Sequence, residues 1–434
     1  MKQSLLFIIA TFFLFCPLFA QYEVSGGNSQ PLSVHKNGIT EIYLLNGLDG
    51  AQIKFTSSQP GEHQWYRYKE SIEDAVSVPC TQNGNISSIT DIQEGYGYYV
   101  DAHMATGYIW IVDYSLYVPR ISGLKVEEDE YRCEQLKLIA DADVPTVYYY
   151  TGTGGRRNVL QRNFRLTYNT LSWNEEQKTF LPSEAALTVT ELFPEILVDN
   201  PPLTNTAFTL TDVFADHFGI TQAAVSEEYR AIKVEAHYSV EKDREFGDNE
   251  KYTPDKMESA PIGYTFTAYA NEPVATFYIW KVSKQDPVTG EYSNTIVRYT
   301  DPVLRYTFKN TGNYEVQLEV DDAQSICTDM PEAIKVSIDS TRIEIPNAFS
   351  PGSSPGVNDE LKVSFSSVLS FQASVFNRWG NLLYRWTDPA KGWNGMVNGK
   401  FVPTGAYLLV VEYTDSVGKK RSKSQMVNIL RSKN

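Results

Sequence analysis

The sequence has little cysteine, little histidine and no excess of positive charge. Its 434 residues include 4 Cys and 5 His, which argues against a Cys- and His-rich metal protein. Lys and Arg number 38 against 53 Asp and Glu, and the net charge of −15 disfavours nucleic acid as the main partner. Apolar residues at 42% and charged residues at 21% are typical of a folded protein, and the length allows three or four domains.

The sequence has only one long apolar run, and it lies at the N-terminus. Lys2 precedes an apolar segment from Leu5 to Phe15, which Pro17 interrupts before the small residue Ala20. This order predicts a secretory signal peptide over residues 1–20, cleaved between Ala20 and Gln21. A lipoprotein site at Cys16 is the alternative, but the bulky pair before this cysteine disfavours it. No later run approaches the roughly 20 residues of a spanning helix, so we expect no transmembrane segment in the mature chain.

Three cysteines remain after removal of the signal peptide: Cys80, Cys133 and Cys327. They allow at most one intramolecular disulfide. Because they are far apart in the sequence, we expect isolated thiols in separate domains, and stability that comes from apolar cores.

Alternating apolar and polar residues predict strands along most of the chain. Tyr314, Val316 and Leu318 alternate with Glu315 and Gln317, as in a strand with one buried face. Strands are also predicted at 39–45, 96–100, 108–112, 146–150, 232–240, 264–269 and 406–413. One short helix is expected as a connector, with Thr211 as its N-cap and Gly219 at its end. The fold class is therefore all-β, with tandem immunoglobulin-like β-sandwich domains that end in a small β-sandwich.

Turn-rich and charged stretches divide the mature chain into four modules. We place the first at residues 21–119, with Trp65 to Tyr68 as a central strand, and a longer second module at 120–252. The charged stretch 241–252 is the expected linker to a third module at 253–340, and the last module covers 341–434.

The third module resembles a PKD-type immunoglobulin-like domain. The resemblance rests on Thr265–Tyr269, on Tyr278-Ile279-Trp280, and on the run from Gly312 to Val320. Trp280 would be the large core anchor of one sheet. Lys281–Lys284 stands where this family has a turn with glycine and an acid. The first two modules fit the immunoglobulin pattern more loosely, through Trp65 in the first and through Cys133 with Leu136 in the second.

The C-terminal module carries the most specific motif. Ile-Glu-Ile-Pro-Asn-Ala-Phe-Ser-Pro at 343–351 is followed by Asn-Arg-Trp-Gly at 377–380 and by Pro-Thr-Gly-Ala-Tyr at 403–407. In this order and spacing the set resembles the gliding-motility-associated C-terminal domain, the type B sorting signal of the type IX secretion system. The matching positions are Pro346, Asn347, Phe349, Pro351, Gly356, Asn358, Asp359, Asn377, Arg378, Trp379, Gly380, Trp393, Gly395, Pro403, Gly405, Tyr407 and Arg431.

The same residues also have a physical interpretation as turn and core residues. Asn377 tolerates a left-handed backbone and Gly380 relieves steric limits, so 377–380 is expected to be a tight turn. Trp379 and Trp393 would be the two large core anchors. Two departures from the family pattern, an acid-free loop at 352–356 and Asn394 in place of an Asp, argue against a metal in these loops, and no cofactor is expected.

Other candidate chemical sites have weak patterns. Gly152–Arg157 resembles a phosphate-binding loop only in its glycines, because strand-like residues rather than a helix follow; a hairpin tip is expected, with an anionic glycan or lipid as a possible ligand of its two Arg. The acidic stretches 127–130, 141–143 and 321–322 are either calcium ligands or solvated faces. The histidines show no ligand spacing. Clustered tyrosines at 96–108 and 148–150 are either ligand contacts or cross-strand pairs.

The predicted function is that of a non-enzymatic exported protein at the cell surface or outside the cell. The resemblance implies the type IX secretion machinery at the outer membrane as one partner, while the immunoglobulin-like modules would bind an unknown protein or glycan ligand in adhesion. The alternative is a structural or sensing component of the secretion or gliding apparatus, retained at the outer membrane. An enzyme without a recognisable site is the remote alternative.

The two signs of charge are unevenly distributed. The last module has 12 Lys and Arg against 6 Asp and Glu, whereas residues 21–340 have 25 against 47. Lys419, Lys420, Arg421 and Lys423 concentrate the positive charge. They form either a solvated hairpin or a basic patch that docks on an acidic export receptor or anionic lipid.

Overall fold

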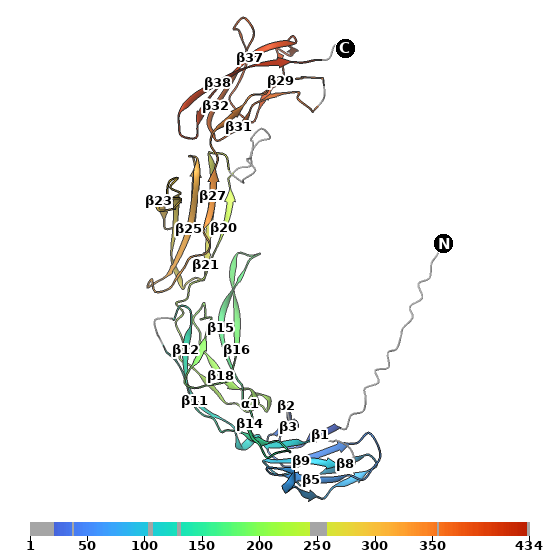
Figure 1. The fold of residues 1–434 in the computed structure, drawn as a ribbon. Coiled ribbons are helices and arrows are strands. Elements are labelled where there is room, and N and C mark those ends of the chain that lie inside the picture. The colour runs from blue at the N-terminus through green and yellow to red at the C-terminus, as the bar shows by residue number, and fades with distance from the viewer. Residues whose placement is uncertain are drawn as a thin grey trace, which may run out of the picture. The chain divides into compact units, whose positions relative to one another are not determined.

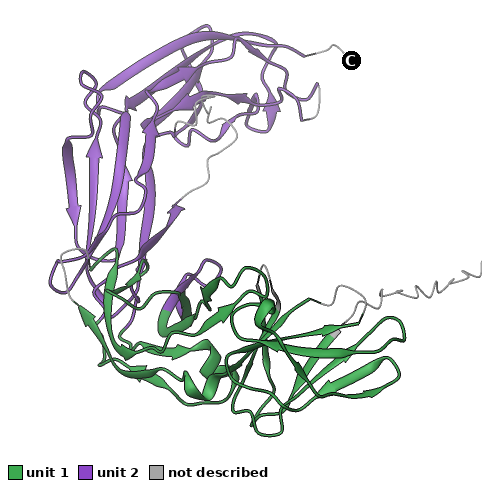
Figure 2. Cartoon of the chain, turned by 60° about the horizontal axis from the view of Figure 1, so that its bottom comes forward, with its two compact units in different colours: residues 1–170, 184–200, 205–230 green, residues 171–183, 201–204, 231–434 purple. Residues whose placement is uncertain are grey.

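The computed structural model describes residues 21–36, 39–102, 107–127, 132–243, 258–353 and 356–431. Strands make up most of the described chain, which confirms the all-β prediction (Figure 1). The chain forms two compact units (Figure 2). The first holds residues 1–170, 184–200 and 205–230, and the second holds 171–183, 201–204 and 231–434.

The first module is built from two sheets. One has the order β1-β4-β8-β7 and the other β2-β3-β10-β9-β5-β6, where β10 runs parallel to β3. Trp65 on β5 is buried in the core between them with Phe55 and Tyr98. The elements are β1 (Gln21–Ser25), β2 (Leu32–Lys36), β3 (Ile39–Leu45), β4 (Gln52–Thr56), β5 (Gln64–Tyr68), η1 (Ile72–Asp74), β6 (Val76–Val78), β7 (Thr81–Asn83), β8 (Ile86–Ile89), β9 (Tyr96–Asp101), β10 (Ile109–Asp113) and η2 (Tyr114–Leu116).

The second module contains the sheets β11-β12-β17 and β16-β15-β18-β19 and the hairpin β13-β14. Its helix α1 (Val213–His217) occurs where the sequence predicts one, but its N-cap is Asp212 rather than Thr211. The strands are β11 (Arg120–Glu127), β12 (Leu136–Asp143), β13 (Tyr148–Tyr150), β14 (Arg157–Val159), β15 (Phe164–Asn174), β16 (Thr179–Val189), β17 (Ile196–Val198), β18 (Thr209–Asp212) and β19 (Ala223–Val225).

The first two modules share an apolar cluster. Trp110 and Tyr114 from the first module pack in it with Tyr149, Phe214 and other residues of the second. Asp212, which caps α1, also pairs with the buried guanidinium of Arg162, and Arg162 donates to the carbonyl oxygen of Tyr117 at 2.9 Å. The predicted seam at residue 119 is therefore crossed by apolar packing and by a buried ion pair.

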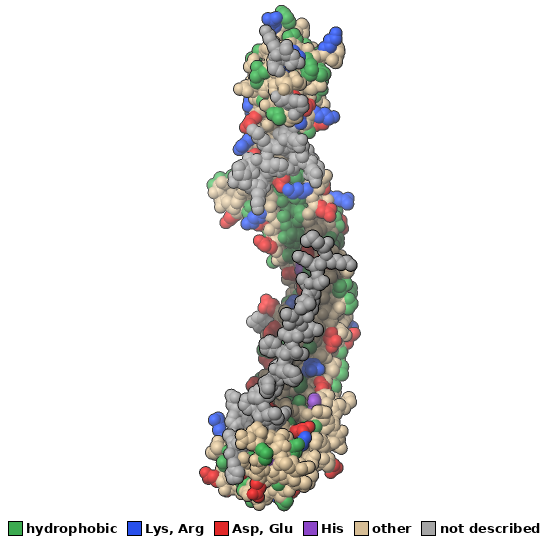
Figure 3. Space-filling model, turned by 90° about the vertical axis from the view of Figure 1, so that its right-hand side faces the viewer, with side chains coloured by type: hydrophobic (Ala, Val, Ile, Leu, Met, Phe, Trp, Pro, Cys, Tyr) green, Lys and Arg blue, Asp and Glu red, His purple; other side chains and the backbone are tan. Residues whose placement is uncertain are grey.

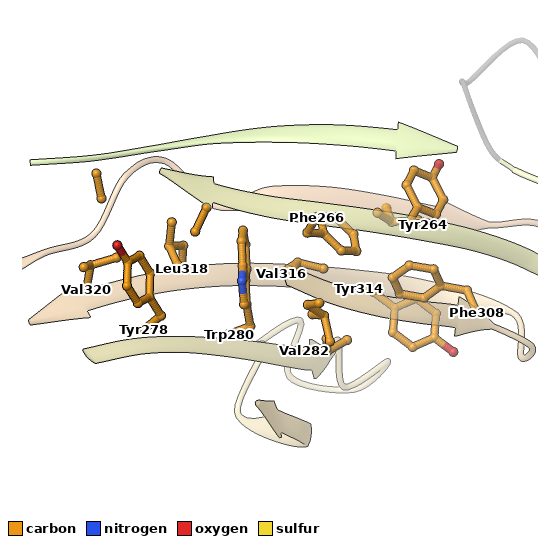
Figure 4. Packing of buried hydrophobic residues seen from close by; sticks show 14 of the residues in the cluster. Tyr264, Phe266, Tyr278, Trp280, Val282, Phe308, Tyr314, Val316, Leu318 and Val320 are labelled. Carbon is orange, nitrogen blue, oxygen red and sulfur yellow. The ribbon is translucent and has the colours of Figure 1, made fainter. Parts of the chain in front are cut away.

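The third module is a sandwich of β20-β21-β24 against β23-β22-β25-β26, with β27 also paired to β25. Trp280 on β22 lies fully buried between Phe266 and the side chains of β25, as the sequence predicts for a core anchor (Figure 4). β20 pairs with β21, so this sandwich begins before the predicted boundary at 253. The strands are β20 (Ala236–Lys242), β21 (Ile262–Ala270), β22 (Ala275–Lys284), β23 (Asn294–Tyr299), β24 (Val303–Phe308), β25 (Gly312–Asp322), β26 (Thr328–Asp329) and β27 (Ile334–Ile338).

The C-terminal module contains the five-stranded sheet β29-β38-β37-β32-β33 and three two-stranded pairs, β28-β31, β30-β34 and β35-β36. β32, β37 and β38 form its centre (Figure 1). The strands are β28 (Arg342–Glu344), β29 (Ala348–Phe349), β30 (Leu361–Lys362), β31 (Ser364–Ser366), β32 (Val368–Phe376), β33 (Leu382–Trp386), β34 (Gly392–Trp393), β35 (Met396–Val397), β36 (Lys400–Phe401), β37 (Gly405–Asp415) and β38 (Lys420–Ile429).

The cysteines differ from the prediction. Cys133 and Cys327 are each disulfide-bonded, and only Cys80 is a free thiol among the described cysteines. The expectation of isolated thiols is therefore wrong for two of the three. Cys133 lies in the turn that precedes β12.

Two other sequence predictions concern the membrane. The proposed signal peptide, including Ala20, lies outside the described residues, while Gln21 is the first residue of β1. Within the described ranges, no helix has the length and apolar character needed to cross a bilayer.

Candidate functional site

The Asn-Arg-Trp-Gly motif forms the turn between β32 and β33. Asn377 shapes this turn through its side chain, whose Oδ1 accepts hydrogen bonds from the amides of Trp379 and Asn381, each at 3.0 Å. The amide of Gly380 donates to the carbonyl oxygen of Asn377 at 2.9 Å, and Gly380 has a φ of +82°. The predicted tight turn is present, but the left-handed residue is the glycine, and Asn377 acts as a hydrogen-bond acceptor instead.

Trp379 lies on the surface, so its predicted role as a core anchor is wrong. Its side chain is 72% exposed at the tip of the turn. The guanidinium carbon of Arg378 lies 4.5 Å from the centre of its ring, which is the geometry of a cation–π contact. The turn thus presents an aromatic ring and a positive charge together, and sequence spacing alone could not separate this arrangement from core packing.

A hollow of about 270 Å³ lies beside this turn. Its walls come from the turn, from β33 and from the loop that leads into β37; the lining residues are Asn377, Arg378, Trp379, Leu383, Val402, Pro403, Thr404, Gly405, Ala406 and Tyr407. The hydroxyl of Tyr407 donates to the carbonyl oxygen of Pro403 at 2.8 Å and so ties the loop to the strand. Six motif residues predicted from the sequence therefore line one hollow. Three come from the turn at 377–380 and three from the segment 403–407.

Charge near this hollow is positive. Burial raises the pKa of the Tyr407 hydroxyl, while the positive charges of Arg431 and Arg378 act in the opposite direction. Arg431 donates from Nη2 to the carbonyl oxygen of Val402 at 2.6 Å, and its guanidinium lies 5.2 Å from the ring centre of Phe401. The two arginines of the motif are thus both within electrostatic reach of the same tyrosine.

Trp393 is the core anchor that the sequence predicts. It is fully buried, and its indole Nε1 donates to the carbonyl oxygen of Met396 at 2.9 Å. Its ring contacts Phe349 and Tyr407. Gly395 has a φ of +76°, and a Cβ there would lie 2.9 Å from Pro351, so a larger residue would displace the proline. These motif residues act in packing.

A second hollow, of about 460 Å³, is lined by five further motif residues, Pro346, Phe349, Gly356, Asn358 and Asp359, with Ala348, Glu360 and Lys362. The Asp359 carboxylate accepts from the amides of Gly352 at 3.1 Å and Gly356 at 2.6 Å. Asn358 takes a φ of +55°, and its carbonyl oxygen accepts from the amide of Ser350. The acid that remains in this loop is therefore used to close the loop on itself.

The motif residue Asn347 joins the two ends of the module. Its carbonyl oxygen accepts from the amide of Asn428 at 2.9 Å. This contact continues the parallel pairing of β29 with β38.

The four residues of the predicted basic patch differ in their surroundings. Arg421 pairs with the buried carboxylate of Asp415, its Nε lying 2.6 Å from Oδ2. Lys423 donates to the carbonyl oxygen of Ile343 at 2.6 Å. Lys419 and Lys420 have exposed side chains, and Lys420 lines a shallow hollow that also includes Glu412. Half of the predicted patch is therefore engaged in holding the module together.

The glycine-rich loop and the clustered tyrosines form contacts within the fold. Gly152–Arg157 forms the tip of the β13-β14 hairpin, with Arg157 stacked 3.5 Å above the ring of Tyr148. Tyr66 stacks on Tyr99 across β5 and β9, which matches the cross-strand alternative for the tyrosines.

The predicted acidic sites also form hydrogen bonds within the fold. Asp322 is buried and accepts from the amides of Gln324, Ile326 and Cys327, and Asp141 accepts from the hydroxyl of Ser122 at 2.7 Å. Residues 128–130 lie outside the described part of the chain. Within the described part, no three His, Cys, Asp or Glu side chains come together as metal ligands.

We did not predict from the sequence a row of apolar side chains across β33, β32, β37 and β38, most of which are exposed. Phe376 on β32 lies opposite Leu382 on β33 and opposite Leu408 on β37, and Leu408 lies opposite Met426 on β38. Leu382, Leu408 and Met426 are 46%, 36% and 51% exposed. The available signal was the apolar residue at a solvent-facing position of each strand, where alternation calls for a polar one.

These sheets define a class of protein, a tandem array of β-sandwich domains. Residues 343–429 match the model of the CHU_C type IX secretion signal domain, and residues 125–226 match that of the fibronectin type III domain. The C-terminal module is therefore a type IX secretion signal domain preceded by an immunoglobulin-like fibronectin type III domain, which confirms the prediction of a sorting domain. Neither matched domain type is an enzyme family.

Whole-chain comparisons add little. No curated protein matches the sequence. Among solved structures, the chain is similar to one described as "Biofilm associated protein - BSP domain", with 9% identity over 96% of each chain and a TM-score of 0.17. A likeness at this level carries no argument about function.

Proposed function

We propose that this protein is a non-enzymatic binding protein of the cell surface or the extracellular medium. Its C-terminal module directs export through the type IX secretion machinery at the outer membrane, and its immunoglobulin-like modules bind a protein or glycan ligand in adhesion. The single observation that carries the proposal is the match of residues 343–429 to a type IX secretion signal domain.

Residues 21–340, which precede the C-terminal module and are here called the passenger, have a structure that supports a binding role. The sandwiches of the passenger have large anchors such as Trp65 and Trp280 in their cores, which leave the sheet faces and the loops at the module ends available for contacts. The distribution of charge supports separate roles for the passenger and the C-terminal module. The passenger from 21 to 340 is acidic, whereas the C-terminal module is basic, and blue Lys and Arg side chains are prominent on the C-terminal module in Figure 3.

The test is a deletion of residues 341–434, compared with the full chain in cells that have the secretion system. We expect the full chain to be cut by protease added to intact cells, or to be found in the medium, and the truncated chain to stay protected in the periplasm. Normal surface delivery of the truncated chain would refute the export role.

Surface exposure also separates the proposal from its alternative. If the full chain stays protected while a known exported cargo is cut, the adhesion role fails. Retention at the outer membrane as a component of the secretion or gliding apparatus then explains the module better.

A further inference from the structure

The backbone of the turn at 377–380 and of the loop that faces it is held by hydrogen bonds. Asn377 holds the turn through two amide hydrogen bonds, and Tyr407 holds the facing loop through Pro403. A partner that binds such a site orders few groups that were free before, which preserves affinity. The rigid frame therefore favours recognition at this end of the module.

The guanidinium of Arg378 is an available cationic donor. It is exposed and stacks on Trp379, and within the described part of the chain it forms no hydrogen bond or ion pair. The ten residues that line the adjoining hollow include no Asp or Glu. A carboxylate that approaches this site would meet a guanidinium with five N–H donors and no competing negative charge in the lining.

The lining of the hollow combines apolar and polar groups. The lining residues include the apolar side chains of Leu383, Val402 and Pro403 and the aromatic residues Trp379 and Tyr407, next to polar groups of the turn and the loop. The exposed row of Leu382, Leu408 and Met426 lies on the opposite face of the sheet, because these residues alternate along their strands with Leu383 and Tyr407, and so it is not part of this hollow. Exposed aromatic and apolar residues beside an arginine are the composition of interface hot spots.

We propose that the hollow between the Arg378–Trp379 turn and the Pro403–Tyr407 loop binds an acidic peptide segment of a protein partner. A carboxylate of that segment pairs with Arg378, and a neighbouring apolar side chain enters the hollow against Tyr407. The inference deepens the proposed function, because it locates on the module the surface that an export partner reads. Charge complementarity favours this occupant, since the whole module is basic.

The test measures binding to the full chain from residue 21 by fluorescence anisotropy. The probe is a short labelled peptide in which Glu alternates with Phe or Leu; one control peptide has Lys in place of Glu, and another has Ser in place of Phe and Leu. We expect the acidic apolar peptide to bind roughly tenfold more tightly than either control, and added salt to weaken it.

Two variants and two matched controls locate the binding. Arg378→Glu and Trp379→Ala should each weaken the peptide by roughly tenfold. Lys391→Glu makes the same charge change at an exposed lysine outside the hollow, and Val417→Ala removes an exposed apolar side chain at the β37–β38 turn; both should bind as the unchanged protein does. Both test residues are exposed, so folding is expected to persist, and circular dichroism checks it.

Several outcomes would overturn the proposal. They are equal binding of acidic and basic peptides, unchanged binding by Arg378→Glu, or binding to phosphatidylglycerol vesicles without binding to the peptide, which would assign the surface to lipid. The deletion experiment is independent of these outcomes. If removal of 341–434 traps the protein while Arg378→Glu is exported normally, the docking site is refuted and the export function stands.

Discussion

Two tryptophans of the C-terminal module have the same residue type and opposite roles. Trp393 is fully buried among Phe349, Tyr384 and Tyr407, whereas Trp379 stands 72% exposed on a turn. The difference comes from the backbone around them. Trp393 ends a short strand that faces the core, while Trp379 is at the outer position of a four-residue turn that Asn377 closes. A large side chain in such a turn has no core within reach.

We predict that these two tryptophans differ sharply in their contribution to stability. Trp393→Ala should lower the free energy of unfolding of the module by about 3–5 kcal/mol, because it removes a buried ring and leaves a cavity. Trp379→Ala should change it by no more than about 0.5 kcal/mol. Urea unfolding of the full chain, followed through the transition of this module, measures both. Equal losses would contradict the assignment of Trp379 to the surface.

The turn between β37 and β38 depends on one carboxylate. Asp415 is buried, and its Oδ1 accepts from the amides of Val417 and Lys419 at 3.2 and 2.7 Å, while Oδ2 accepts from Arg421 Nε at 2.6 Å. The hydrogen bond from Arg421 is the main reason why the pKa of Asp415 lies below its usual value, and the turn amides add to this. The longest hairpin of the module is thus closed by an ionised acid.

We predict that this hairpin contributes less to stability in acid. Because the pKa of Asp415 is lower in the folded protein than in the unfolded chain, its stabilisation is complete at neutral pH and is lost as the pH falls below about 4. Asp415→Asn should therefore lower the melting temperature of the module at pH 7, and the difference from the unchanged protein should shrink near pH 3. Thermal melts at the two pH values test this. A difference that stays constant with pH would show that the charge is unimportant.

On the scale of the whole molecule, apolar packing does not follow the four modules drawn from the sequence. The first and second modules share a cluster that contains Trp110 and Phe214, and the first compact unit holds the first module with residues 120–170, 184–200 and 205–230 of the second. The third and fourth modules have clusters of their own, around Trp280 and Trp393, within the other unit. We therefore expect the cooperative unfolding units to follow these clusters rather than the four sequence modules.

We predict more than one thermal unfolding transition in calorimetry. Trp65→Ala, in the core of the first module, should shift one transition to lower temperature, and Trp280→Ala, in the third module, should shift a different one. The two variants serve as controls for each other because each removes a fully buried indole. A single transition that moves equally with either variant would mean that the whole chain unfolds as one unit.

Much of the fold could be predicted from the sequence because strands, turns and helix ends depend on patterns of neighbouring residues. The alternation at 314–320, the turn at 377–380 and the short helix near 213 are patterns of neighbouring residues, and each occurs where it was expected. The sorting domain was predictable for the same reason, since its motifs are short and ordered along the chain. The burial of Trp280 also followed from local sequence, because it belongs to a strand rich in apolar residues.

Contacts between distant residues depended on the tertiary structure. Strand pairing decided that β20 joins the third sandwich, and packing across the predicted seam joined the first two modules. Only folding brought Arg378 and Trp379 beside Pro403 and Tyr407 around one hollow. The physical reason is that residue spacing specifies the local backbone, whereas burial, pairing and the shape of a surface depend on which strands meet.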